Sequence, residues 1–526
     1  MNNLTLVSLQ FGSIAPSLVL IVGALVLLLI NVFARAFDSA QRLLNVALCS
    51  IALLLSMIAS AYLQPGEAFF TLVHISGFTI LAQLTMGLCA LVFIVLSFGG
   101  GACGVDSGCA IAWASDDRGF RVGEFYPLYL FMVAGFDLMV SSQNLLVILL
   151  GLEIGSLSLV ALIALNQNLA SIEAGVKYFV LSVLASVLYI AGVLCWYIAS
   201  ASFDLGALYN AMSMGSYLSG FAIVLGIIFM VAAIGFKISA VPFHSWTPDV
   251  YQGSSAIMAG VISIIPKIAA FTLAISVFSL FVQSNLQWLV SYVLYPIIVL
   301  SVTLPNIAAL VQKDIKRMLA FSSISHSGFV LACILINTQM SLSALYLYWI
   351  LFVVSNLGAF GLLAKTNFVN TPESSAITCD KLAGVARIAP AYGVLGGIFF
   401  ISLAGIPPFG LFFGKVGVVM SAFSLDYVWL GGILLINSAI AVFYYLRPVV
   451  AMYFQTPANF ARLSQEVHNA SEQCSQSSPK SFGGFYFSAN TFAKILLWGL
   501  AIACCISIFM VQFLLDFIGQ YVVGAY

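Results

Sequence analysis

Three lysines lie inside otherwise apolar stretches of the chain: Lys237, Lys267 and Lys415. An ionisable side chain in the middle of a membrane span costs about 2.5–3.5 kcal/mol on insertion scales, so its default interpretation is functional. A lysine also shifts its pKa readily when it is buried, which allows it to bind and release a proton under modest electrostatic control. The three residues therefore predict a proton path.

A short polar break between the first two of these lysines contains Pro242, His244 and Asp249. Pro242 has no backbone N–H to donate, so it interrupts the helix that carries Lys237. Broken helices occur in membranes where they line a cavity or an ion path. The break therefore favours a functional role for the lysine beside it.

Two further charged residues are candidates for the same path, Glu153 and Lys177. Glu153 is the only glutamate deep in a predicted span, where a lone carboxylate would be protonated or paired with a cation. Lys177 lies one to two turns into the next span and could instead be an interfacial lysine that extends its ammonium group to the membrane surface. Glu173 lies one turn earlier and is placed to form an i,i+4 ion pair with Lys177.

Histidines supply the secondary candidates. His326 lies in mid-span in the sequence FSSISHSGFV, among small hydroxyl residues, and is either a proton relay or a neutral histidine with satisfied hydrogen bonds. His244 at the break has the same two interpretations. Asp137, near the outer end of its span, is interpreted as an interfacial residue. The sequence contains no C-x-x-C, H-E-x-x-H or Walker A pattern, so it predicts no metal or nucleotide site.

The composition places these residues in a membrane. Of 526 residues, 62% are hydrophobic and 7% are charged, whereas a soluble domain carries about 25% charged residues. The formal net charge of zero argues against a nucleic-acid partner. No basic region precedes the first apolar run, which is therefore interpreted as a retained span rather than a signal peptide. The cysteines mostly occur singly in apolar runs, and for Cys103 and Cys109, which share a loop, free thiols are favoured over a redox pair.

A span needs about 20 apolar residues, and on this basis the sequence predicts an all-α polytopic membrane protein with about fourteen transmembrane helices. The predicted spans are 13–34, 43–63, 78–98, 125–141, 143–165, 172–199, 217–240, 254–282, 285–305, 318–337, 341–364, 388–424, 427–454 and 491–516. The twelfth is long because Pro407 and Pro408 split it.

The distribution of basic residues predicts the orientation. The chain has 18 Lys and Arg residues. Apart from the three lysines in the membrane, all of them lie in or beside odd-numbered connections between spans, such as 35–42, 306–317 and 455–490. Because cytoplasmic loops carry an excess of Lys and Arg, the odd connections are predicted to be cytoplasmic and both termini to lie on the outer face.

Two blocks of five helices, 125–282 and 283–454, each contain an interrupted helix in the fourth position. The interruptions are ISAVPFHSW in the seventh span and ISLAGIPPFG in the twelfth. Because each block has an odd number of helices, a repeat that relates them must be inverted, and matching interruptions indicate an ion path near the midplane. The alternative is that prolines merely kink both helices. The other segments are three N-terminal helices (1–98), a cytoplasmic loop (99–124), a mobile cytoplasmic loop (455–490) and a last helix with an outer tail (491–526).

Several phrases of the sequence resemble, in the same order, those of the antiporter-like membrane subunits of respiratory complex I. They are GLEIGSLSLVAL, EAGVKYFVLS, FKISAVPFHSWTPDVYQG, PKIAAF, DIKRMLAFSSISHSGFVL and GIPPFGLFFGK. The resemblance runs from about Glu124 to Arg447. FHSWTPDVYQG, EAGVKYF and the short chain after the last span are similar in particular to the N subunit of this proton-pumping NADH:quinone oxidoreductase.

The resemblance implies fourteen helices, two inverted five-helix repeats with broken helices 7 and 12, and a chain of buried acid and lysines along the midplane. Carried over to this sequence, Glu153 and Lys237 are the paired residues of the first half-channel. Lys177 is an additional member of that site. Lys267 is the connecting central lysine, and Lys415 is the outlet residue of the second half.

The resemblance also implies that this chain has no redox centre of its own and couples quinone reduction to proton translocation. NAD(H), FMN, iron–sulfur clusters and quinone would be bound by partner subunits. The expected partners are other membrane subunits of the complex on both sides, in a hetero-oligomer within a bacterial inner (plasma) membrane.

Three features depart from the family pattern. Phe409 and Gly410 replace the usual small residues after the second proline, which bears on hydration near the outlet lysine. The loop 99–123 looks longer than usual and is expected to touch a neighbouring subunit. Asp137 is an acid that the family pattern does not contain.

Two other functions fit the same residues. One is a subunit of a multi-subunit cation/proton antiporter, which has no redox partner, and the other is the membrane arm of a hydrogenase-type complex. The N-subunit phrases favour the oxidoreductase, as does the lack of the long lateral helix found in the largest family member. A purely structural spacer would need no buried lysines, because they cost energy.

Overall fold

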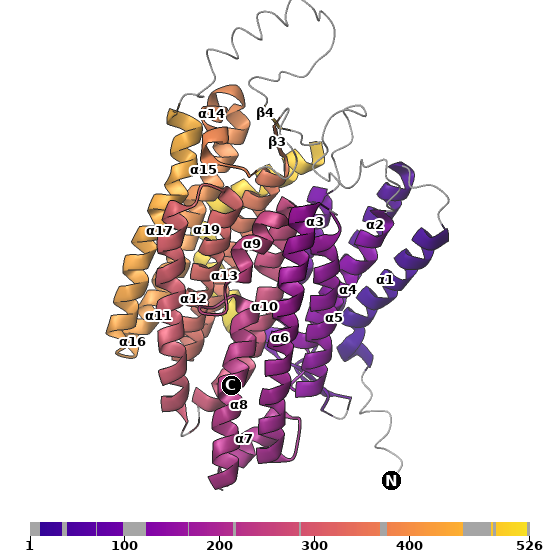
Figure 1. Ribbon diagram of the computed structural model, residues 1–526, viewed down its shortest axis with the longest axis vertical. Coiled ribbons are helices and arrows are strands. Elements are labelled where there is room, and N and C mark those ends of the chain that lie inside the picture. The colour runs from indigo at the N-terminus through magenta and orange to yellow at the C-terminus, as the bar shows by residue number, and fades with distance from the viewer. Residues whose placement is uncertain are drawn as a thin grey trace, which may run out of the picture.

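The structure, a computed structural model, describes residues 11–33, 39–69, 71–97, 122–166, 168–213, 217–282, 284, 286–368, 376–455, 485–487 and 491–522. Within these residues the chain is a bundle of long helices with two short two-stranded sheets (Figure 1).

A hairpin joins the second and third long helices. The N-terminal elements are η1 (Phe11–Ile14), α1 (Ala15–Phe33), α2 (Ser39–Ala61), β1 (Gly66–Ala68), β2 (Val73–Ile75) and α3 (Gly77–Ser97). The two strands are antiparallel, with Glu67 opposite His74.

The first block of membrane helices has a broken fourth member, as predicted. Its elements are η3 (Val122–Glu124), α4 (Phe125–Val140), α5 (Leu145–Ala164), α6 (Leu169–Ser200), α7 (Leu205–Ser213), α8 (Tyr217–Ile238), α9 (Trp246–Gly253) and α10 (Ala256–Val282). Helix α8 ends one residue after Lys237, and Pro242 and His244 lie in the break before α9.

The second block repeats this order, again with its fourth helix broken. Its elements are α11 (Gln287–Val311), α12 (Ile315–Ile336), α13 (Gln339–Ala364), β3 (Thr366–Phe368), η4 (Cys379–Leu382), α14 (Val385–Ile388), α15 (Pro390–Ala404), α16 (Leu411–Ser424) and α17 (Val428–Phe454); β4 (Phe485–Phe487) and α19 (Thr491–Val522) follow. Pro407 and Pro408 lie in the break between α15 and α16.

Helix count and class agree with the prediction. In the described part of the chain, 12 helices are long and apolar enough to cross a membrane. The shorter apolar helix α4 and the broken pair α15–α16 account for the other two predicted spans. The prediction of an all-α polytopic membrane protein is therefore confirmed.

Side-chain caps mark several helix starts. Asn144 accepts hydrogen bonds from the backbone N–H groups at the start of α5, and Asn168 does the same for α6. Asp314 caps α12, and Thr338 forms a capping box with Ser341 at the start of α13. Because the first N–H groups of a helix have no partner within it, these polar residues set where the spans begin.

Both described chain ends lie at the same end of the bundle. Ile14, before α1, and Tyr521, near the end of α19, pack against a small apolar cluster that includes Ala68, Val73 and Ile75 of the hairpin. We call this the hairpin end; α7 lies there, at the bottom of Figure 1. The same location for both ends requires an even number of crossings.

The opposite end of the bundle, at the top of Figure 1, carries α14, β3 and β4, and we call it the basic end. Successive spans run in opposite directions, so the described basic residues outside the midplane lysines all lie toward this end. They are Arg42, Lys177, Lys313, Lys316, Arg317, Lys365, Lys381, Arg387, Arg447 and Lys494.

The interior of the bundle is formed by α10, α12 and α13, which are almost wholly buried, whereas α1 and α19 are mostly exposed. The predicted lysine path runs through this interior, because Lys267 lies on α10 and His326 on α12.

One predicted loop contains regular structure. In the segment 455–490, predicted to be mobile, residues 485–487 form β4, which pairs antiparallel with β3. The hydrogen-bonding partner lies more than a hundred residues earlier in the chain, so local composition could not reveal it. Cys103 and Cys109 lie outside the described residues, and the described cysteines are free thiols.

Candidate functional site

Lys237 lies on the last turn of α8, directly before the break, and is 4% exposed. Its ammonium group donates hydrogen bonds to the hydroxyls of Ser156 on α5 (2.6 Å) and Ser182 on α6 (2.9 Å). The rings of Tyr178 and Phe236 lie 5.9 and 5.6 Å from its Nζ atom, within the range of cation–π attraction. The contacts of this ammonium group are therefore with neutral groups.

Glu153 on α5 is linked to Lys237 through serines. Its carboxylate accepts a hydrogen bond from the hydroxyl of Ser186 on α6. The same hydroxyl lies 3.1 Å from the backbone carbonyl oxygen of Ser182, one turn earlier. Ser182 in turn contacts Lys237 through its hydroxyl. Among the described ion pairs none joins Glu153 directly to Lys237, although the two charges interact electrostatically. The predicted pair is thus connected through Ser186 and through the backbone and side chain of Ser182.

Lys267 joins the two blocks of helices. It follows Pro266 in the middle of α10, and its side chain is fully buried. Its Nζ atom donates to the Ser323 hydroxyl (2.7 Å), the Ser323 carbonyl (2.9 Å) and the Ser327 hydroxyl (3.0 Å), all on α12. The Tyr251 hydroxyl of α9 lies 3.3 Å from the Ser323 hydroxyl. The central lysine is therefore also held by neutral oxygens.

His326 lies between Lys267 and Lys415 on the predicted path. Its Nδ1 atom is hydrogen-bonded to the Tyr348 hydroxyl of α13, and its Nε2 atom lies 3.1 Å from the Tyr445 hydroxyl of α17. The charges of both Lys267 and Lys415 act on it. A histidine with a hydroxyl at each ring nitrogen can accept a proton on one nitrogen and release it from the other.

Lys415 on α16 contacts the broken end of α15. Its Nζ atom donates to the carbonyl of Ala404 at 2.8 Å, and the last carbonyls of a helix have no partner within it. Gly405 follows with φ +74°, and an added Cβ there would lie 2.9 Å from the lysine Nζ atom. On the other side of the break, Gly410 donates its N–H to the Ser507 hydroxyl of α19 at 2.9 Å. Glycine at position 405 therefore keeps space beside the lysine, whereas glycine at position 410 keeps space for Ser507 and Leu351.

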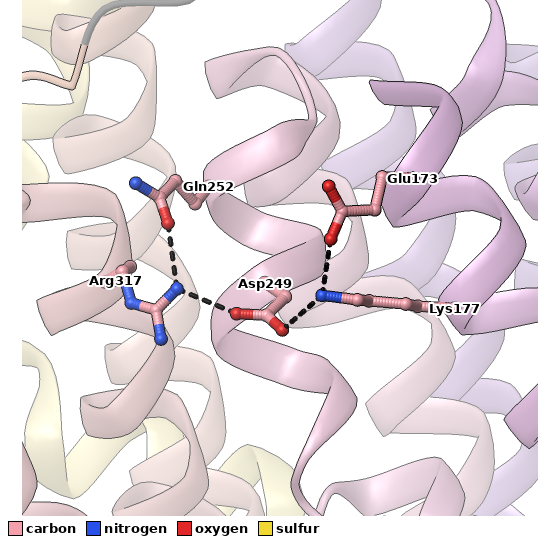
Figure 2. Close-up of polar contacts among 5 residues, drawn as sticks. All are labelled: Glu173, Lys177, Asp249, Gln252 and Arg317. Atoms are coloured by element: carbon pink, nitrogen blue, oxygen red, sulfur yellow. Dashed lines mark hydrogen bonds and ion pairs between the residues drawn. The ribbon is translucent and has the colours of Figure 1, made fainter. Parts of the chain in front are cut away.

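A second polar group lies at the basic end of the bundle (Figure 2). Asp249 of α9 accepts hydrogen bonds from Lys177 of α6 at 2.9 Å and from Arg317 of α12 at 2.7 Å. Lys177 also pairs with Glu173 at 2.7 Å, as predicted, and Arg317 donates to the side-chain oxygen of Gln252 at 2.8 Å. We call these five residues the Asp249 cluster; it connects helices of both blocks through α9.

The structure does not place Lys177 with Glu153 and Lys237. Its side chain is 42% exposed and its ion pairs are with the acids of the Asp249 cluster. The reason is its position near the start of α6, about two turns nearer the basic end than Ser186. The resemblance implied that Lys177 belongs to the first half-channel site. The structure instead places its side chain with Glu173 and Asp249.

Asp137 and His244 have surroundings that differ from those expected from the sequence. Asp137 is 3% exposed, so the interpretation as an interfacial residue is wrong: α4 is covered on several sides by other helices. His244 is half-buried in the first break, and its Nδ1 atom has no hydrogen-bond partner among the described residues. Unlike His326, it is not held between two hydroxyls.

Sequence reasoning missed the hydroxyl groups that hold the lysines. Ser182 and Ser186 on α6, and Ser323 and Ser327 on α12, are spaced four residues apart, so each pair lies on one helix face. That spacing is a signal that could have been used. The partners of His326 had no comparable signal, because they lie on other helices, 22 and 119 residues along the chain.

Comparisons with known proteins identify relatives of the chain. The sequence model of a protein family described as "NADH:quinone oxidoreductase/Mrp antiporter, TM" matches residues 142–441. NADH-quinone oxidoreductase subunit N of Helicobacter acinonychis (strain Sheeba) is 38% identical over 97% of this chain and 98% of its own length. Subunit N of Campylobacter hominis is 39% identical over 98% of both chains.

Solved structures show the same fold. A chain of respiratory complex I from Thermus thermophilus has 24% identity and a TM-score of 0.73, over 95% of this chain and 98% of its own. A chain of the Mrp complex from Dietzia sp. DQ12-45-1b has 16% identity and a TM-score of 0.77, over 98% of both. Because the fold is shared more widely than the sequence, the near-full-length identity to the subunit N relatives decides the assignment. The chain belongs to the NADH-quinone oxidoreductase subunit N family.

Proposed function

We propose that this chain is a proton-translocating membrane subunit of an NADH:quinone oxidoreductase, in which quinone reduction drives protons along its buried lysines. The observation that carries the proposal is the set of contacts made by Lys237, Lys267 and Lys415. All three are buried, and their described hydrogen-bond partners are hydroxyls or carbonyls rather than carboxylates.

Neutral partners suit a group that must change its charge. A hydroxyl can donate or accept a hydrogen bond, so it can serve an ammonium group and a neutral amine in turn. A direct carboxylate partner would instead hold the lysine in its charged form. The serines around Lys237 and Lys267 therefore support a role in proton exchange over a role as structural cations.

The arrangement supports a direction for the path. The Asp249 cluster lies at the basic end, near the first block, and its exposure allows proton uptake from water. The path continues through Lys237 with Glu153 beside it, then Lys267, His326 and Lys415. The basic end is the cytoplasmic side in this proposal, because cytoplasmic loops carry the excess of Lys and Arg. Both termini then lie on the outer face.

The electron-transfer chemistry belongs to partners in this proposal. NAD(H), FMN, iron–sulfur clusters and quinone are bound by other subunits, and other membrane subunits of the complex flank this chain on both sides. The names of its relatives and the likeness to a complex I chain support such an assembly in a bacterial inner membrane.

The test uses the intact complex in sealed vesicles, with proton uptake and quinone reduction measured together. Lys237→Ala and Glu153→Gln are each expected to lower proton translocation per electron, the lysine variant by about tenfold or more, because a transfer group is removed. Lys313→Ala, at an exposed lysine of the basic end, is the control and should leave the ratio unchanged. An unchanged ratio in both path variants, with the complex assembled, would reject the proposal.

The second candidate function is a subunit of a multi-subunit cation/proton antiporter or a related membrane complex. The TM-scores of 0.77 to chains of the Mrp complex and of the membrane-bound sulfane sulfur reductase favour it at the level of fold. Purification in mild detergent separates the candidates. Iron–sulfur and quinone-site subunits should co-purify with an oxidoreductase subunit, and only other transporter subunits with an antiporter.

A further inference from the structure

A buried acid, Asp137, lies away from the lysines, near the hairpin end of α4. Asp137 is 3% exposed, and its Oδ2 atom is buried without a hydrogen-bond partner among the described residues. It takes part in none of the described ion pairs. A buried carboxylate with neither cation nor donor is costly, so such a group normally takes up a proton or a cation.

Gln83 of α3 lies over the same face of α4. Its side-chain amide donates to the hydroxyl of Ser141 at 2.9 Å, and that hydroxyl donates to the backbone carbonyl of Asp137 at 2.6 Å. Ser141 follows Asp137 by one helical turn, so the two side chains share a face. Gln83 is 4% exposed, and its Oε1 atom is also buried without a partner. Two acceptors without donors therefore lie on one patch.

A single proton would satisfy both atoms. A protonated carboxyl group has an O–H donor, whereas an ionised one only accepts, and an amide oxygen only accepts. We propose that Asp137 is a proton-binding site, separate from the lysine row, whose protonated carboxyl group donates a hydrogen bond to Oε1 of Gln83.

The site is joined to the hairpin by a backbone hydrogen bond. The backbone N–H of His74 donates to the carbonyl of Ser141 at 2.8 Å. Burial lowers the pKa of His74, and the negative charges of Glu67 and Asp204 only partly oppose this effect. His74 itself is half-buried in β2, and its contact with Ser141 fixes the hairpin against the end of α4 that carries the Asp137 site.

Several titratable groups lie on α4 and on the elements packed against it. Helices α1, α2, α3, α5 and α10 pack against α4. Within the described residues, the titratable groups of these elements, of η3, of α4 itself and of the hairpin are Arg42, Cys49, Glu67, His74, Cys89, Glu124, Tyr126, Tyr129, Glu153 and Lys267. None of them forms an ion pair with Asp137 in the part of the chain that the structure describes.

Infrared difference spectroscopy of the intact complex between mildly acidic and alkaline buffer tests the proposal without any need for proton pumping, so it is independent of the proposed function. We expect a carbonyl-stretch band of a protonated carboxylic acid that is lost in Asp137→Asn. In Gln83→Leu the band should remain and shift to higher frequency, because the acceptor of its proton is removed. Asp426→Asn, at an exposed acid between α16 and α17, is the matched control and should leave the band unchanged.

Three outcomes would overturn the proposal. The first is a wild-type spectrum without a band that depends on Asp137, which would mean that the residue is ionised. The second is an unshifted band in Gln83→Leu, which would mean that the Asp137 carboxyl group does not donate to Gln83. This outcome does not depend on whether the Asp137→Asn variant folds. The third is loss of the wild-type band on addition of sodium at constant pH, which would identify a cation site instead.

Discussion

Lys415 differs from the other two buried lysines in what it contacts. Lys237 and Lys267 are held by serine hydroxyls, whereas the described partner of Lys415 is the free carbonyl of Ala404 at the end of a broken helix. A carbonyl accepts from an ammonium group and also from a neutral amine. The contact therefore permits proton release without breaking the hydrogen bond.

The arginine variant distinguishes release from support at this position. Moving one charge across the membrane is worth about 2.3 kcal/mol per 100 mV. On the proposed path, Lys415 must lose its proton for that charge to leave the membrane. Arginine keeps the charge but does not deprotonate. We expect Lys415→Arg to lower proton translocation per electron nearly as much as Lys415→Ala, by about tenfold or more. Proton uptake and quinone reduction in vesicles provide the measurement. Full pumping in the arginine variant would make Lys415 a structural cation.

The broken helices show how the membrane interior tolerates irregular backbone. At the first break, Val241 donates its N–H to the Ser301 hydroxyl at 2.8 Å, and Trp246 donates to the carbonyl of Phe236 at 3.3 Å. Freed backbone groups in a membrane must find partners within the protein. Neighbouring helices supply them here, which keeps each break in place beside its lysine.

Gly405 is the position where the second break is most sensitive. Its φ of +74° disfavours other residues by about 1–2 kcal/mol, and an added Cβ would press on the Lys415 side chain. We expect Gly405→Ala to lower the free energy of unfolding by about that amount and also to reduce pumping. Thermal unfolding of the purified complex and vesicle assays measure the two effects. Gly432→Ala is the control, because an added Cβ there meets nothing within 4 Å; equal behaviour of the two variants would contradict the prediction.

At the scale of the whole molecule, contacts of the candidate residues help to connect the blocks. Lys267 of the first block binds Ser323 of the second in the interior. At the basic end, Asp249 of the first block pairs with Arg317 of the second block and also with Lys177 of the first. Ion pairs this exposed contribute at most about 1 kcal/mol each, so packing in the interior carries most of the stability. These contacts also fix where α9 lies between α6 and α12.

Labelling of introduced cysteines tests the orientation of the molecule. In a background with Cys103, Cys109 and Cys474 changed to serine, an impermeant maleimide added outside intact cells should label Glu67→Cys at the hairpin end. It should leave Lys313→Cys at the basic end unlabelled until the membrane is inverted. Both native residues are exposed. The reverse pattern would invert the topology derived from the basic residues.

The sequence by itself determined the membrane class, the order of the spans, both breaks and the lysines at the midplane. These features depend on local properties: the length of an apolar run, a proline that cannot donate, a charge among apolar neighbours. The Glu173–Lys177 pair belongs here too, because residues four apart on a helix are neighbours.

Only the tertiary structure decided what the candidate residues contact. Ser156 lies 81 residues from Lys237, and Tyr445 lies 119 residues from His326. Such pairs depend on how helices rotate and pack against one another, which local pattern does not specify. The same reason explains Lys177, drawn to Asp249 rather than to the lysine path, and Asp137, buried although it lies near the end of its helix. A helix end is interfacial only when no other helix covers it, and that depends on the whole bundle.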